Sequence, residues 1–99
     1  MNSNNPLPAY QFLELLKQLP FIKAIYLFGS RARGDQRDRS DIDLAIDSPE
    51  ASVKNWLQVQ DIIENADTLL KIDCVRLDKA NNELKKTIYH EGKKLYERH

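Results

Sequence analysis

The sequence has little of what redox and zinc chemistry require. Cys74 is its only cysteine, so no intrachain disulfide can form, and His90 and His99 are its only histidines. Cys74 lies in an apolar stretch, where a buried and unreactive thiol is the usual outcome. Zinc sites draw their ligands mainly from cysteine and histidine, and this chain has too few of them, too far apart. These shortages argue against a disulfide framework, a redox thiol and a histidine-based metal site.

The chain also lacks a charge excess and a long hydrophobic run. Lys plus Arg and Asp plus Glu both number 15, so the formal net charge is zero. Proteins that grip duplex nucleic acid through its phosphates are usually basic, so this partner class is disfavoured. The apolar run that ends at Phe28 is far shorter than the roughly 20 residues that span a bilayer. The N-terminus has neither the basic start nor the apolar core of a signal peptide, so we expect a cytoplasmic protein.

What remains is the composition of one small globular domain. Of the 99 residues, 41% are hydrophobic and 30% are charged. A chain of this size builds a single core and has no room for a second, substrate-binding domain. We therefore predict one domain over residues 1–99, with the polar residues 1–6 disordered, and expect any large substrate to come from another chain.

Hydrophobic periodicity and helix-breaking residues predict three helices and three strands. The expected helices cover residues 8–19, 49–65 and 78–92, and the expected strands cover 22–28, 41–47 and 69–77. Ser48 offers an N-cap for the middle helix, and residues 93–99 form a short tail. This order predicts an α/β (α+β) fold, a small three-stranded β-sheet with helices on one face.

A phosphate-binding turn is suggested by Gly29 and Ser30, which directly follow the first predicted strand. Glycine adopts positive φ and allows a ligand close to the backbone. Backbone amides at such a turn favour an anion, and the Ser30 hydroxyl adds a donor. A Gly-Ser pair alone is more often a plain turn, so this feature needs a second one beside it.

The second feature is a pair of carboxylates, Asp41 and Asp43, on the next predicted strand. Residues i and i+2 of a strand share one face, about 6.6 Å apart along the axis. Like charges held side by side are costly unless a cation neutralises them. Two Mg²⁺ ions are the natural complement, and a solvated polar strand face is the alternative.

Asp73 is the candidate for a third carboxylate. It lies between apolar neighbours in the last predicted strand, where an aspartate rarely stands without a partner. If that strand pairs beside the Asp41/Asp43 strand, Asp73 reaches the same metals and helps to deprotonate an incoming hydroxyl. An aspartate that faces water from an edge strand is the alternative.

Four arginines lie between the Gly-Ser turn and the acids. Arg31 and Arg33 are predicted to bind phosphate groups held at the turn and to neutralise their negative charge. For Arg37 and Arg39 we favour a solvated loop paired with nearby acids, and the same reading is the alternative for the first two.

Together these residues resemble the minimal nucleotidyltransferases of the DNA polymerase β-like superfamily. The resemblance is carried by Gly29-Ser30-Arg31-Ala32-Arg33-Gly34 and by Ser40-Asp41-Ile42-Asp43-Leu44. It implies a polymerase β-like nucleotidyltransferase fold with a small mixed β-sheet, and it places the β- and γ-phosphates of a nucleoside triphosphate at Gly29 and Ser30. It also implies two Mg²⁺ ions held by three acids, at positions that match Asp41, Asp43 and Asp73.

The same resemblance implies a reaction and a partner. Minimal nucleotidyltransferases commonly act as antitoxins that transfer AMP from ATP to a tyrosine hydroxyl of a helical HEPN-type toxin. Two alternatives stay open. One is a binding module that neutralises its partner by contact, and the other is a catalytic subunit that acts on a small molecule or an RNA end.

Overall fold

The computed structural model describes residues 10–35, 37 and 39–98, so Pro8 and the start predicted to be disordered lie outside the described residues. The elements in order are helix α1 (Gln11–Lys17), strand β1 (Ala24–Phe28), helix α2 (Ser30–Arg33), strand β2 (Ile42–Asp47), helix α3 (Val53–Glu64), strand β3 (Ile72–Arg76), 3₁₀ turn η1 (Leu77–Lys79), helix α4 (Asn82–Glu91) and strand β4 (Lys93–Glu97). None of the helices described is long and apolar enough to cross a membrane.

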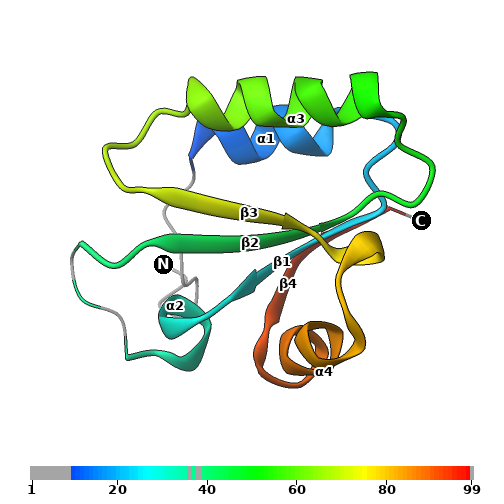
Figure 1. Ribbon diagram of the computed structural model, residues 1–99. Coiled ribbons are helices and arrows are strands. Elements are labelled where there is room, and N and C mark those ends of the chain that lie inside the picture. The colour runs from blue at the N-terminus through cyan, green and yellow to red at the C-terminus, as the bar shows by residue number, and fades with distance from the viewer. Residues whose placement is uncertain (1–9, 36, 38, 99) are drawn as a thin grey trace.

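The strands form one mixed sheet in the order β3-β2-β1-β4 (Figure 1). β1 pairs antiparallel with β2 and with β4, whereas β2 and β3 are parallel. A parallel pair needs a crossover connection, and α3 provides it. The predicted mixed sheet is confirmed, but the segment expected to be a tail is the fourth strand, β4. Its exposed residues and high charge gave no strand pattern because β4 lies at the edge of the sheet.

The two faces of the sheet are covered unequally. On one face α1 and α3 lie side by side over the main core, in which Phe12, Leu16, Leu44 and Val59 are buried (Figure 1). The prediction of helices on one face alone is wrong, because α4 packs on the opposite face. There its Ile88 joins a second, smaller apolar cluster.

This second cluster has a physical reason in the strands themselves. Ala45 lies between Asp43 and Asp47 on the face that the alternating pattern marked as polar. Ala45 is fully buried, and Tyr26 and Val75 from the neighbouring strands pack around the same cluster. The apolar patch formed by the three strands needs a cover, and α4 supplies it.

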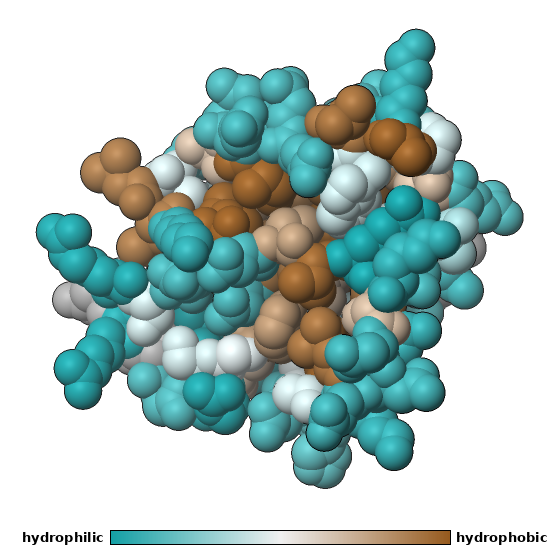
Figure 2. All heavy atoms as spheres, viewed as in Figure 1, coloured by the Kyte–Doolittle hydropathy of each residue, from teal (hydrophilic) through white to brown (hydrophobic). Residues whose placement is uncertain are grey.

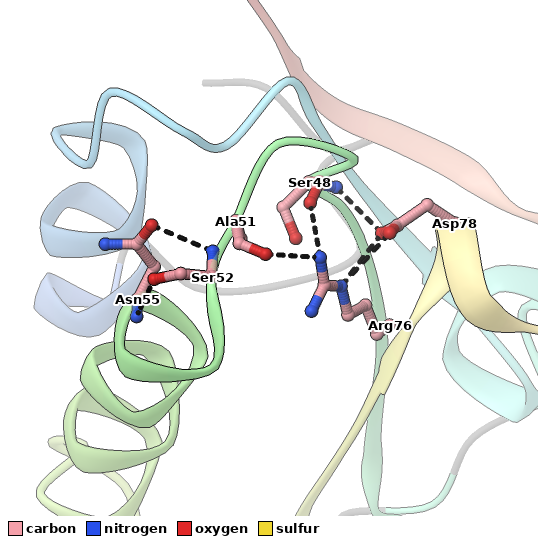
Figure 3. A network of polar contacts seen from close by, with 6 residues as sticks. All are labelled: Ser48, Ala51, Ser52, Asn55, Arg76 and Asp78. Atoms are coloured by element: carbon pink, nitrogen blue, oxygen red, sulfur yellow. Dashed lines mark hydrogen bonds and ion pairs between the residues drawn. The ribbon is translucent and has the colours of Figure 1, made fainter.

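The start of α3 also differs from the prediction. The N-cap is Ser52 and not Ser48, because Ser52 Oγ accepts the Asn55 N–H at 3.0 Å while the Asn55 side chain accepts the Ser52 N–H (Figure 3). This reciprocal pair is a capping box. Ser48 instead is a buried residue that directly follows β2, and its backbone N–H donates to Asp78.

A polar network ties the end of β3 to the segment before α3 (Figure 3). Arg76 pairs with Asp78 at 3.1 Å, and its Nη2 donates to the carbonyls of Ser48 and Ala51 at 3.0 and 2.8 Å. The Arg76 guanidinium also lies 5.6 Å from the centre of the Trp56 ring. These contacts hold the crossover connection against the sheet at one end of the β2–β3 pair.

Candidate active site

The Gly-Ser turn lies where β1 ends and α2 begins. Gly29 has φ 74°, a conformation that residues with a side chain rarely adopt. A Cβ at Gly29 would overlap the carboxylate of Asp43. Glycine is therefore required twice at this position, for the turn and for the close approach of Asp43. Ser30 starts α2, whose first amides have no acceptor within the helix.

The sheet register brings acids of two strands level with each other. Asp43 on β2 is opposite Asp73 on β3 and opposite Phe28, the last residue of β1. The condition set for Asp73, that the third predicted strand pairs beside the second, is thereby met. Asp41 lies one residue before β2. Asp43 is thus the central acid, with Asp73 beside it across the ladder and Gly29 against its carboxylate.

The charges of the two other acids act on the carboxyl of Asp43. Burial raises the pKa of the Asp43 carboxyl, and the negative charges of Asp73 and Asp41 raise this pKa further. Arg33 and Lys71 lower it, but the balance is upward. A carboxylate that carries such a cost in the folded state is a candidate for a functional group.

The side chains offer the right donors for a divalent cation without gathering them closely. Carboxylate oxygens are the ligands that Mg²⁺ prefers, so the three acids fit such an ion in kind. In the part of the chain that the structure describes, no three His, Cys, Asp or Glu side chains converge closely enough to hold a metal. Asp73 is half-exposed and lies 3.6 Å from Lys71 Nζ. Lys71 is thus the cation beside the Asp73 carboxylate in this structure.

The two predicted phosphate-binding arginines differ in their surroundings. Arg33 is exposed, lies 3.3 Å from Asp35 and 4.0 Å from Glu91, and is close enough to Asp43 to lower its pKa. Arg31 is buried, and both of its bonding nitrogens, Nε and Nη2, donate to the carbonyl of Ser40. Arg33 is thus placed to meet an anion, whereas Arg31 is bonded to the protein. The role of Ser40 was missed, although it immediately precedes Asp41 in the quoted motif.

A groove of about 450 Å³ lies elsewhere, between α3 and the edge strand β3. Figure 2 shows hydrophobic surface in this region, with hydrophilic residues around it. Ile72 and Cys74 line the groove and alternate along β3 with Asp73, so the groove and the acids are on opposite faces of the strand. Burial raises the pKa of the Cys74 thiol to about 12, in agreement with an unreactive cysteine.

A comparison with protein families matches residues 11–99 to the model of the polymerase beta nucleotidyltransferases. The chain belongs to this family. The match spans both motifs and Asp73, and it confirms the predicted fold and the predicted class of enzyme, a nucleotidyltransferase.

Two relatives carry more specific names. The chain is 33% identical over 78 residues to a Methanocaldococcus jannaschii protein that is provisionally named a protein adenylyltransferase, with 76% of this chain and 78% of the relative covered. It is 30% identical over 89 residues to the protein adenylyltransferase MntA of Shewanella oneidensis, with 87% of this chain and 63% of MntA covered. The chain thus spans less than two thirds of the length of MntA.

Similar solved structures come from toxin–antitoxin systems. A toxin–antitoxin with AMP-PNP superposes with a TM-score of 0.69 at 29% identity, covering 87% of this chain and 70% of that one. The toxin–antitoxin MntA–HpeT, in a mutant form, superposes with a TM-score of 0.66 at 30% identity, covering 89% and 71%. The nucleotidyltransferase fold of this chain therefore occurs in toxin–antitoxin structures, one of which contains a nucleotide analogue.

Proposed function

We propose that this chain is an antitoxin that transfers AMP from ATP to a tyrosine hydroxyl of a HEPN-type toxin. The observation that carries the proposal is the arrangement of acids around Asp43. Asp73 is its register partner on the adjacent parallel strand, the charge of Asp41 acts on it, and Gly29 lies against its carboxylate. The names of the relatives support the acceptor, because they are protein adenylyltransferases. The expected cytoplasmic location stays a prediction.

Each site residue has a proposed task. Gly29 and Ser30 hold the β- and γ-phosphates at the turn, and the cation of Arg33 neutralises charge on the triphosphate and on the departing pyrophosphate. Asp41, Asp43 and Asp73 are the proposed metal ligands. Magnesium bound by these carboxylates supplies charge neutralisation for the triphosphate and acidifies the acceptor hydroxyl.

The proposed transfer is an in-line displacement at the α-phosphorus. The acceptor oxygen forms a bond to phosphorus while the bond to the leaving pyrophosphate breaks. Asp73, which is half-exposed on the edge strand β3, is the proposed acceptor of the hydroxyl proton. The chain itself contributes positioning and fixed charge, so an acceptor on another protein completes the reaction.

The decisive experiment incubates this chain with a HEPN-type toxin, ATP and Mg²⁺. Mass spectrometry of the toxin should show the addition of one or more AMP groups on tyrosine. The variant Asp43→Asn should lower the transfer rate by more than about a hundredfold, since losing a residue that merely supports a metal ligand costs up to that much. The matched control is Asp61→Asn, which removes an acid from α3 on the other face of the sheet.

The outcomes separate the alternatives. Modified toxin with wild type and Asp61→Asn but not with Asp43→Asn supports the proposal. Toxin that is inhibited but carries no AMP would show that the chain neutralises its partner by contact. Equal transfer by Asp43→Asn and wild type would overturn the assignment of the acids.

A further inference from the structure

Arg31 is directed at the residue that precedes the first acid. Its Nε and Nη2 donate to the Ser40 carbonyl oxygen at 3.2 and 2.9 Å. Arg31 is only 8% exposed, so its guanidinium is largely withdrawn from water. Hydrogen bonds from a charged donor are stronger than neutral ones, and two donors on one acceptor also fix its direction. The Ser40 carbonyl is therefore held firmly in place.

Asp41 needs this support because it lies outside the sheet. Asp43 is held in the ladder between its partners on β1 and β3. By contrast, β2 begins at Ile42, whose N–H donates to the Lys71 carbonyl at 2.9 Å. The Ser40 carbonyl and the Asp41 amide belong to one planar peptide unit, so fixing the carbonyl fixes the backbone from which the Asp41 side chain departs.

Ser40 also organises the loop on its other side. Its Oγ accepts the Arg37 N–H at 2.7 Å, and its own N–H donates to the Arg37 carbonyl at 3.0 Å. Ser40 is thus bonded through its amide, its hydroxyl and its carbonyl. The hydrogen bonds to the Ser40 carbonyl come from α2, the helix that starts at Ser30. Arg31 therefore links the Gly29–Ser30 turn to the loop that leads into Asp41.

We infer that Arg31 is a positioning residue that sets Asp41 relative to the Gly29–Ser30 turn, in place of the phosphate contact expected from the sequence. The catalytic consequence of this inference rests on the proposed function. The structural consequence does not, because the order of the loop can be measured without ATP or an acceptor. The two failures can therefore be told apart.

The first test measures amide hydrogen exchange by NMR in Arg31→Gln. This variant loses the charge and the paired donors. The amides of Arg37 and Ser40 should exchange at least about tenfold faster, whereas the β1 amides keep their wild-type rates, because only the local loop opens. Arg39→Gln is the matched control, since it removes an exposed arginine from the same loop. Unchanged exchange at Arg37 and Ser40 would overturn the inference.

The second test separates positioning from phosphate binding by kinetics. In Arg31→Gln, kcat for AMP transfer should fall by about 10- to 100-fold, the usual cost of losing a group that orients a metal ligand. The KM for ATP should change less than about twofold, because the substrate contacts remain. A large rise in KM with kcat retained would instead make Arg31 a phosphate ligand.

Arg31→Lys keeps the test valid if Arg31→Gln does not fold. It retains the charge but offers one nitrogen where arginine offers two, so it should recover part of kcat and part of the exchange protection. Recovery of neither property in a folded Arg31→Lys protein would count against the inference. If the wild-type chain transfers no AMP, the proposed function fails, and the exchange rates alone decide whether Arg31 orders the loop.

Discussion

The two ends of the β2–β3 pair treat charge in opposite ways. At one end Arg76 and Asp78 have side chains only 15% and 12% exposed, and their charges are paired with each other and with backbone groups. At the other end Asp43 and Asp73 face each other as like charges, and the pKa of Asp43 is raised by burial and by its acidic neighbours. The same two strands therefore lead to paired opposite charges at one end and carry neighbouring like charges at the other.

This difference separates stability from chemistry. The network around Arg76 has its donors and acceptors matched, so it holds the crossover connection in place. At the acid end Lys71 and Arg33 offset only part of the negative charge around Asp43, and a site for a cationic ligand requires such an excess. We expect substitutions at the first end to lower stability and substitutions at the second to raise it.

The largest expected effect on stability comes from Arg76→Met. The variant leaves the Ser48 and Ala51 carbonyls without their donor and Asp78 without its cation, which should lower the free energy of unfolding by about 2–3 kcal/mol. Urea unfolding followed by circular dichroism measures the change. Transfer activity of the folded variant should stay at the wild-type level, because Arg76 is remote from the acids.

The control for Arg76→Met is Lys17→Met, which removes an exposed ion pair with Glu14. Exposed pairs contribute little, so the loss should be below about 0.5 kcal/mol. Equal losses in the two variants would contradict the view that the Arg76 end of the sheet is the stabilising one.

The next effect comes from two serines near the Arg76 network. Ser52→Ala removes the N-cap of α3 and should cost about 1 kcal/mol. Ser48→Ala removes a buried hydroxyl that has no hydrogen-bond partner among the residues described, so it should be neutral or slightly stabilising. Thermal unfolding of both variants decides which serine is the cap, and a larger loss for Ser48→Ala would reverse the assignment.

The smallest effect is expected at the acid end, in Asp43→Asn. The raised pKa of Asp43 means that folding favours the protonated carboxyl. The stability gained in this way is fully present below the ordinary pKa of aspartate and is lost as the pH rises through the pKa of Asp43 in the folded protein. Asparagine is uncharged at every pH, so the variant avoids this loss of stability. At pH 7 Asp43→Asn should therefore be more stable than wild type by about 0.5 kcal/mol. Urea titrations of both proteins should show that the difference in free energy of unfolding shrinks as the pH is lowered. A difference that widens on acidification would contradict the raised pKa of Asp43.

The sequence predicted the two strands that carry the candidate acids better than it predicted the elements around them. The alternation around Asp43 marked β2 and its charged face, and the apolar neighbours of Asp73 marked β3, because both strands carry a strong local pattern. The parallel pairing of the two strands could be stated only as a condition. Register depends on contacts between residues that are remote in sequence.

What was missed has the same cause. The backbone amides of Gln11 and Phe12 at the start of α1 donate hydrogen bonds to the carboxylate of Asp67, 56 residues after Gln11. The sequence near α1 contains nothing that predicts such a distant cap. α4 covers a patch that forms only when three strands are assembled. The hydrogen bonds of Arg31 could not be foreseen because their acceptor, the Ser40 carbonyl, is a backbone group that every residue possesses.

The even spacing of side chains along β3 has one further consequence. Ile72 and Cys74 pack against the main core, and Asp73 between them points to the other side. A slip of one residue against β2 would turn Asp73 inward and set an apolar side chain beside Asp43. The packing of Ile72 and Cys74 against the core thus fixes the register that places Asp73 beside Asp43. Mutations that loosen the packing of Ile72 would therefore displace the Asp73 carboxylate, although they do not change Asp73 itself.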